Sequence, residues 1–270
     1  MFQTFLHIFK MKPTFLSMKS HKDQLNRFFE LEKVPQRIVS LVPSQTELLV
    51  DLGLRDKIVG VTKFCVHPEN LRKEKTVVGG TKTVNFDKIK KLYPDIILCN
   101  KEENTEEMVL ELEKIAPVHV SDVKNIDDTF DLIQQYGKIF QVEKNASKLI
   151  EKIKTAFSDF EKFIQQKESK SVAYFIWKDP WMLAGKNTFI NYLLQMNRFE
   201  NVFSNLENRY PEVNLSEIAE KNPQLILLSS EPFPFKEKHK NEFLPFAKEV
   251  KIVDGEYFSW YGSRLVEALD

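Results

Sequence analysis

Cysteine is scarce in this 270-residue chain, which has only Cys65 and Cys99, and neither belongs to a CxxC pair. Two cysteines alone cannot supply the three or four ligands of a zinc site, and they fit a protein that does not depend on disulfides. Net charge is also missing, because 39 Lys and Arg balance 39 Asp and Glu. Without an overall positive field, nucleic acid is not an expected partner.

Long apolar segments are missing as well. No run approaches the roughly 20 residues of a membrane span, so none is predicted. Polar residues and a proline interrupt the stretch MFQTFLHIFKMKPTFLSMKS, and no small-residue cleavage site follows, so we predict no signal peptide. We therefore expect a cytoplasmic protein, with a periplasmic location as the alternative if the true start lies elsewhere. Residues 1–36 are expected to form a frayed N-terminal extension.

Strand-like and helix-like segments alternate through the first half, and the 22 Phe and 42% hydrophobic residues suffice for a packed core. The predicted strands span residues 37–42, 57–62, 95–99 and 117–121, and the predicted helices span residues 43–53, 86–92, 105–115 and 126–140. Ser44 and Glu47 have the spacing of a helix capping box. This alternation predicts a parallel sheet covered by helices on both faces.

A long amphipathic segment interrupts the alternation. From residue 143 to about 167, apolar residues recur every three or four positions without Gly or Pro, which predicts one helix of roughly 37 Å. Such a helix can bridge two lobes, and the alternative is a surface helix of a single domain. The first interpretation divides the chain into an N-terminal lobe (37–142), a linking helix (143–168) and a C-terminal lobe (169–270).

The two halves share a sequence pattern. FDKIKKLYPDIILCNKE (86–102) aligns with LSEIAEKNPQLILLSSE (215–231), which pairs Pro94 with Pro223 and Glu102 with Glu231. Together with the long helix, the match favours two similar lobes. The predicted fold class is α/β, with two lobes that each hold a mostly parallel sheet flanked by helices, one long α-helix joining them, and a ligand cleft between them.

Aromatic and ionisable residues gather after the predicted strands. Ligands of open parallel sheets bind beyond the carboxyl ends of the strands, so we expect these side chains to line both walls of the cleft. The candidates are Phe64, Cys65, His67, Lys82, Glu102, Glu103, Trp177, Trp181, Glu231, Phe233, Tyr257, Trp260, Tyr261 and Arg264. The alternative for the aromatic residues and Cys65 is core packing, and for the glutamates it is helix capping.

An enzyme is the competing hypothesis for these loops. Cys65 and His67 could form a thiolate and its base, or His67 could hold a divalent metal together with a glutamate. No oxyanion site or defined reaction is recognisable, and VVGGTK lacks the GxxxxGK[ST] phosphate loop. We therefore predict a binding protein rather than an enzyme.

Three segments carry a family resemblance: RIVSLVPSQTELLVDLGL, IVGVTKF and VVGGTKTVNFDKIKKLYPDIILC. From about Arg37 to the C-terminus, the chain resembles the substrate-binding proteins for vitamin B12 and ferric siderophores, the helical backbone metal receptors. The resemblance implies a monomer without an intrinsic cofactor that holds a metal chelate between rigid lobes and docks on an ABC transporter permease. The chelate would be a corrinoid such as cobalamin, or secondly a ferric siderophore or haem; a cytoplasmic corrinoid carrier or sensor is a further alternative.

The resemblance also suggests roles for particular residues. Aromatic residues that cradle the corrinoid match positions near Phe64 and Tyr257, and the acidic docking residues match Asp87 and Glu217. His67 is a candidate axial ligand to the chelated metal. Two features depart from the family pattern: no export signal is recognisable, and the loops carry more ionisable groups than an aromatic cradle requires.

Overall fold

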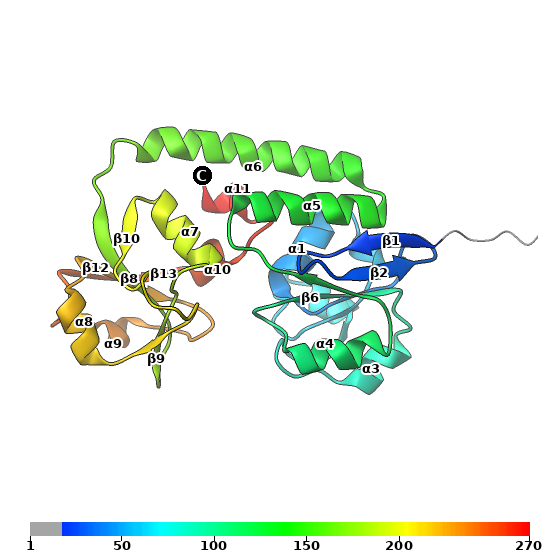
Figure 1. Cartoon of the computed structure of the whole chain (residues 1–270), viewed down its shortest axis with the longest axis horizontal. Helices are drawn as coiled ribbons and strands as arrows, with labels where there is room; N and C mark the ends of the chain where they lie inside the picture. Colours follow the sequence, from blue (N-terminus) through cyan, green and yellow to red (C-terminus); the bar gives the residue numbers. More distant parts are fainter. Residues whose placement is uncertain (1–17) are drawn as a thin grey trace, which may run out of the picture.

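The computed structural model describes residues 18–270, which form two lobes below one long helix (Figure 1). The N-terminal lobe holds a five-stranded, fully parallel sheet with strand order β5-β4-β3-β6-β7. Its strands are β3 (Ile38–Ser40), β4 (Ile58–Val61), β5 (Thr76–Val77), β6 (Ile96–Asn100) and β7 (Val118–Ser121). Its helices are α1 (Pro43–Asp51), η1 (Arg55–Lys57), α2 (Leu71–Glu74), α3 (Phe86–Lys91), α4 (Glu106–Glu113) and α5 (Ile126–Phe140).

The C-terminal lobe holds a second sheet, with the path β11-β9-β8-β12-β13 and β10 paired with β8. Strands β8, β10, β12 and β13 run parallel, whereas β9 and β11 are antiparallel to their neighbours. The strands are β8 (Lys170–Trp177), β9 (Trp181–Leu183), β10 (Phe199–Asn201), β11 (Glu212–Val213), β12 (Leu225–Ser229) and β13 (Glu249–Val253). The helices are α7 (Phe189–Met196), α8 (Leu215–Lys221), α9 (Glu237–Lys240), α10 (Gly255–Ser259) and α11 (Leu265–Ala268).

Helix α6 (Glu143–Ile164) joins the lobes and runs along the top of both (Figure 1). Its 22 residues span roughly 33 Å, and its buried side chains Ala146, Ile150 and Ile153 belong to a core cluster that combines residues of the N-terminal lobe with others of the C-terminal lobe, such as Phe189 and Leu265. The two-lobe prediction is confirmed. The alternative, that this segment is a surface helix of a single domain, is wrong.

The repeated sequence pattern forms the same local structure twice. Asn85 and Asn214 are the N-caps of α3 and α8, and each side chain accepts a hydrogen bond from the backbone N–H three residues ahead. Each helix leads into a fully buried strand, β6 or β12, near the middle of its sheet. The predicted capping box at Ser44 is wrong, because Val42 is the N-cap of α1 and Glu47 binds Arg264 instead.

An antiparallel hairpin of β1 (Lys19–Lys22) and β2 (Phe28–Leu31) precedes the first lobe. The expected fraying is therefore wrong for this part of the extension, while residues 1–17 lie outside the described part of the chain. The Val120 N–H donates to Asp23, the Asp122 N–H donates to Gln24, and Arg27 donates to the Val118 carbonyl. The hairpin thereby supplies hydrogen-bond partners to backbone groups at the open edge of β7, which protects that edge from pairing with another chain.

Candidate functional site

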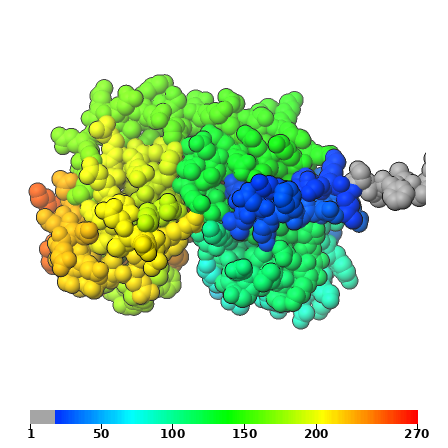
Figure 2. Space-filling model, viewed as in Figure 1, coloured from blue at the N-terminus to red at the C-terminus, as the bar shows by residue number. Residues whose placement is uncertain are grey.

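Loops from both lobes meet beyond the carboxyl ends of the parallel strands. Figure 2 shows the lobes as two masses that touch in the middle, with an indentation between them on the side away from α6. The loop after β4 contacts α10, and the loop after β6 contacts the segment before β11, through side-chain hydrogen bonds. These four segments are far apart in sequence, so this meeting point depends on the two-lobe fold.

The first interlobe contact is the His67 cluster, formed by His67, Glu256, Trp260, Arg264 and Glu47. His67 Nε2 lies 2.9 Å from Glu256 Oε2, and the His67 ring packs edge-on to Trp260 at 5.5 Å between centroids. Arg264 donates two hydrogen bonds to Glu47, at 2.5 and 3.0 Å, and lies 3.5 Å from Glu256. Its guanidinium also covers the Trp260 ring at 5.0 Å. The cluster joins the N-terminal lobe to α10 and the end of the chain.

The second contact is the Arg209 cluster. Arg209 Nη1 lies 2.6 Å from Glu102 Oε1 and 3.0 Å from Asp122 Oδ1, and the Tyr210 hydroxyl donates to Glu102 Oε2 at 2.5 Å. Burial raises the pKa of Asp122, but hydrogen bonds from Arg209 and Lys124 outweigh that effect and hold the pKa below its usual value. The Asp122 carboxylate is therefore charged at neutral pH, and Arg209 contacts both Asp122 and Glu102.

Buried hydrogen bonds form a floor between the two clusters. Gln45 Nε2 donates to the Tyr261 hydroxyl at 3.0 Å, and the Tyr136 hydroxyl donates to Gln45 Oε1 at 2.6 Å. Ser121 Oγ lies 3.4 Å from the same Tyr261 oxygen. Tyr261 is buried, and burial raises its pKa, so it is a neutral interlobe support rather than an open wall.

Two further glutamates lie between the lobes. Glu231 follows β12, and its Oε1 accepts hydrogen bonds from Trp260 Nε1 at 2.9 Å and Ser259 Oγ at 3.1 Å. Burial, followed by repulsion from Glu256, raises its pKa to about 7. Burial also raises the pKa of Glu103 on the opposite lobe. Repulsion from Glu103 is a smaller cause of the raised pKa of Glu231.

Close packing fixes the position of Glu231. A Cβ at Gly255 would lie 2.3 Å from Ser229 Oγ and 2.6 Å from Glu231 Cγ. The Gly255 N–H also donates to Ser230 Oγ at 3.0 Å. Only glycine lets the loops after β12 and β13 approach this closely.

Three of the predicted aromatic residues are exposed around this region: Phe64, Trp177 and Tyr257, at 48%, 40% and 38%. Phe64 lies in the loop after β4 and Tyr257 lies in α10, and the His67–Glu256 contact joins these two segments. Trp177 packs edge-on to Phe233 at 5.8 Å, on the C-terminal lobe. Exposed aromatic side chains are therefore present on both lobes, with Phe64 on the N-terminal lobe and Trp177 and Tyr257 on the C-terminal lobe.

Several predicted wall residues are buried or occupied. Cys65 has no exposed surface, its sulfur lies 3.2 Å from Thr46 Oγ1, and burial raises the pKa of its thiol. Our predictions of a cleft-lining or nucleophilic Cys65 are wrong, because its side chain belongs to the core below the loop. Trp181 lies in β9 and packs against Phe235 and Phe243, so its prediction as a loop residue is also wrong.

Other predicted side chains are already engaged. Trp260 is only 6% exposed, which leaves little of its ring for a ligand to stack on. Arg264 is held by its carboxylate partners, so it is not free to bind an anion. Lys82 donates to the Glu102 carbonyl oxygen from an exposed position. Asp87 is exposed in the first turn of α3, whereas Glu217 accepts a hydrogen bond from the Asn214 N–H in a capping box.

The sequence analysis missed Arg209, Tyr210, Asp122 and Glu256. Arg209 and Tyr210 lie in the NRYP motif before β11, which does not directly follow a predicted strand, whereas most of the predicted site residues do. Glu256 directly precedes a selected residue, Tyr257, and a search for charged neighbours of the aromatic positions would have found it.

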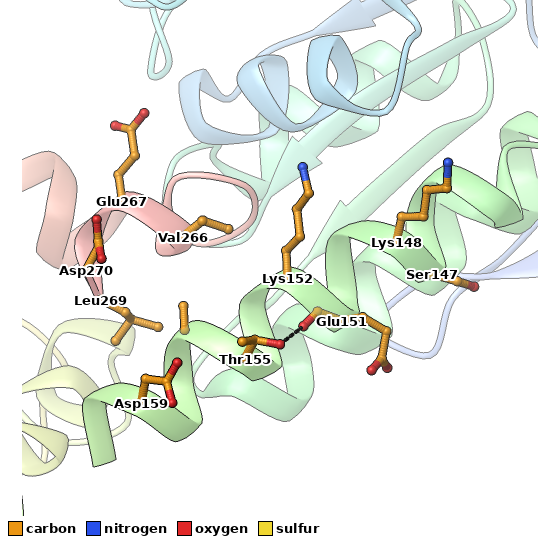
Figure 3. A pocket seen from close by; sticks show the side chains of 11 residues that line it. Ser147, Lys148, Glu151, Lys152, Thr155, Asp159, Val266, Glu267, Leu269 and Asp270 are labelled. Atoms are coloured by element: carbon orange, nitrogen blue, oxygen red, sulfur yellow. Dashed lines mark hydrogen bonds between the residues drawn. The ribbon is translucent and has the colours of Figure 1, made fainter. Parts of the chain in front are cut away.

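No three His, Cys, Asp or Glu side chains between residues 18 and 270 are grouped as a metal site. Over the same residues, no helix combines the length and apolar character needed to cross a bilayer. A groove of about 850 Å³ runs between α6 and the chain end, lined by Lys148, Lys152, Thr155 and Leu269 among others (Figure 3). None of the predicted ligand residues lines it, so the interlobe region is the candidate site.

The family model described as "Periplasmic binding protein" matches residues 38–250, which is most of the chain and covers both lobes. The chain belongs to the periplasmic binding protein family. An uncharacterized ABC transporter substrate-binding lipoprotein of Bacillus subtilis is 28% identical, over 92% of this chain and 82% of the relative. A vitamin B12-binding protein of Pectobacterium carotovorum is 24% identical, over 87% of this chain and 86% of the relative.

The fold of this periplasmic binding protein also matches solved structures. The periplasmic vitamin B12-binding protein of Vibrio cholerae superposes with a TM-score of 0.77 at 20% identity, over 87% of this chain and 94% of that one. The predicted fold class and family resemblance are confirmed. The expectation of a cytoplasmic protein is wrong, because the relatives are named as a substrate-binding lipoprotein and as periplasmic. That expectation rested on the first residues, which lie outside the described part.

Proposed function

We propose that this chain is the substrate-binding component of an ABC-type uptake system and holds a corrinoid of the cobalamin type between its lobes. The observation that carries the proposal is the His67–Glu256 contact, which joins the loop of Phe64 on one lobe to the helix of Tyr257, α10, on the other. Exposed aromatic faces on two walls, with polar groups between them, suit a flat macrocycle with polar edges. Relatives named as vitamin B12-binding proteins support the same ligand class.

Isothermal titration calorimetry of the purified protein with cyanocobalamin tests the proposal. We expect saturable binding, and we expect Trp177→Ala to weaken it at least about tenfold because the ligand loses a stacking surface. The unfolding midpoint should stay close to that of the wild type, since Trp177 is 40% exposed. Phe28→Ala is the matched control, because Phe28 is an exposed aromatic residue on the N-terminal hairpin. Absence of saturable binding would refute the proposal.

His67 is the proposed contact to the chelated metal. Its Nε2 faces Glu256 in this structure, so coordination requires that contact to break. The visible spectrum of bound corrinoid in wild type and His67→Ala separates the alternatives, because loss of an axial nitrogen changes the absorption bands and an unchanged spectrum excludes coordination.

For transport, we propose that the protein acts as a monomer and docks on a permease through the starts of α3 and α8. Asp87 is exposed there. Glu217 keeps one carboxylate oxygen in its capping box, which leaves the other for a partner. Charge reversal at Asp87 should reduce uptake by cells without changing corrinoid affinity, and equal loss of both would contradict a docking role.

A further inference from the structure

A buried histidine lies beneath the N-terminal hairpin of β1 and β2. His119, in β7, has no exposed surface, and Phe29 of β2 packs edge-on to its ring at 6.0 Å between centroids. The Tyr136 ring of α5 also lies edge-on to it, at 5.3 Å. The imidazole therefore packs against two aromatic rings, one of which belongs to the hairpin.

The neighbouring side chains accommodate only one proton on this imidazole. Gln135 Nε2 donates to Asp131 Oδ2 at 2.7 Å, so Gln135 Oε1 is the atom that faces His119 Nε2, at 2.8 Å. Nε2 must then carry the ring proton and donate it. Nδ1 is buried, and within residues 18–270 it has no hydrogen-bond partner. A second proton, on Nδ1, would place a cation in the core with an unpaired N–H, which is costly.

The charged groups around His119 do not offset this cost. Asp23 of the hairpin and Asp131 of α5 favour the cation, whereas Arg27 of the hairpin opposes it. Both aspartates are already engaged, Asp23 by Arg27 and Asp131 by two amide side chains. Burial is the largest influence, and it lowers the pKa of His119 below the ordinary value of 6.5.

A second imidazole joins the same row of rings. His21 of β1 stacks on Phe29 at 5.6 Å, so the rings of His21, Phe29 and His119 adjoin one another. Burial, followed by the charge of Lys19, lowers the pKa of His21 as well. When the hairpin lifts from β7, water reaches both imidazoles and each regains its ordinary affinity for a proton.

We propose that His119 makes the docking of the hairpin on β7 sensitive to acid, because the docked hairpin excludes a proton that the open state binds. The docked state is fully favoured above about pH 6.5 and loses its advantage as the pH falls below that value. Since one proton is involved at His119, the shift is at most about tenfold per pH unit. Acidification thereby uncovers the edge of β7 without unfolding the lobe.

Amide hydrogen exchange, followed by NMR, measures the opening directly. The Val120 N–H donates to Asp23 and the Asp122 N–H donates to Gln24, so these two amides lose their acceptors when the hairpin lifts. After correction for the intrinsic effect of pH on exchange, we expect their protection to fall about tenfold between about pH 7.5 and 5.5. Amides of β3, the central strand of the same sheet, should keep their protection.

Two variants assign the effect to His119. His119→Phe keeps an aromatic ring in place but does not titrate, and His119→Gln keeps a neutral amide donor for Gln135. Both should abolish the fall in protection. His239→Phe is the matched control, because it removes a buried histidine from α9 of the C-terminal lobe, and it should leave the fall unchanged.

Three outcomes would overturn the proposal. Protection of Val120 and Asp122 that does not change with pH in wild type would show that docking is insensitive to acid. A fall that persists in both His119 variants would remove the effect from this residue. An equal fall in β3 would show that the whole lobe unfolds rather than that the hairpin lifts.

Discussion

Glu231 should make the folded protein less stable as the pH rises through neutrality. Its pKa lies at about 7 in the folded state, against an ordinary value of 4.5, because burial and the charge of Glu256 disfavour the carboxylate. The folded state therefore holds a proton that the unfolded state has released. The stabilising contribution of this proton is complete below about pH 4.5 and is lost as the pH rises to about 7 and beyond. At about 1.36 kcal/mol per pKa unit, the whole effect is about 3 kcal/mol.

Glu231→Gln removes this dependence. The glutamine oxygen can still accept from Trp260 Nε1 and Ser259 Oγ, so the variant imitates the protonated side chain. Relative to wild type, its free energy of unfolding should increase by about 2–3 kcal/mol between pH 5 and pH 8. Urea unfolding followed by tryptophan fluorescence at both pH values measures the difference.

The matched control for this measurement is Glu168→Gln. Its difference from wild type should be independent of pH, because the side chain is exposed. If wild type and Glu231→Gln show parallel pH profiles, the carboxyl group of Glu231 titrates as it would in water. That result would refute the account of a desolvated interlobe glutamate.

Three further substitutions test the contacts that position the lobes and the site. Asp23→Ala removes the acceptor of the buried Val120 N–H and of the partly buried Leu25 and Arg27 N–H groups, and it should cost about 2–4 kcal/mol in urea unfolding. Glu30→Ala on the exposed side of the hairpin should cost under about 0.5 kcal/mol, and similar losses would contradict the edge-capping role. Gly255→Ala should displace Glu231 and lower the free energy of unfolding by about 1–3 kcal/mol, and a neutral effect would show that the loops can separate freely. Arg209→Ala leaves its two carboxylates facing each other and should lower the free energy of unfolding by about 1–3 kcal/mol at low salt, and an unchanged value would contradict a stabilising role of the Arg209 cluster.

The fold could be predicted from local signals. Asn85 and Asn214 begin helices for the same physical reason, since each short side chain caps an N-terminal N–H, and the apolar strands that follow are buried on both faces. The long helix was equally predictable from the spacing of its apolar residues. Caps and apolar periodicity are set by residues close together in the sequence, so these predictions needed no knowledge of tertiary contacts.

The site was predicted less well because its contacts join distant segments. The spacing of Glu47 from Ser44 suggested a cap, but its carboxylate pairs with Arg264, 217 residues further along. Cys65 and His67 are neighbours in one loop, yet the first points into the core and the second across the gap. Which side chain faces which lobe depends on how the lobes dock, and local periodicity does not encode that docking.

The same interlobe contacts constrain how a ligand can enter. Rotation of one lobe away from the other would stretch the floor hydrogen bond from Gln45 to Tyr261 and both charged clusters, in addition to bending α6. Hydrogen bonds to charged groups contribute about 1.5–3 kcal/mol each, so breaking several at once is costly. Breaking only the His67–Glu256 contact costs less, because it is a single contact and its side chains are 34% and 17% exposed, so solvent can reach both partners. We therefore expect a ligand to enter by local rearrangement of His67 and the exposed aromatic side chains, while the spacing of the lobes stays nearly fixed.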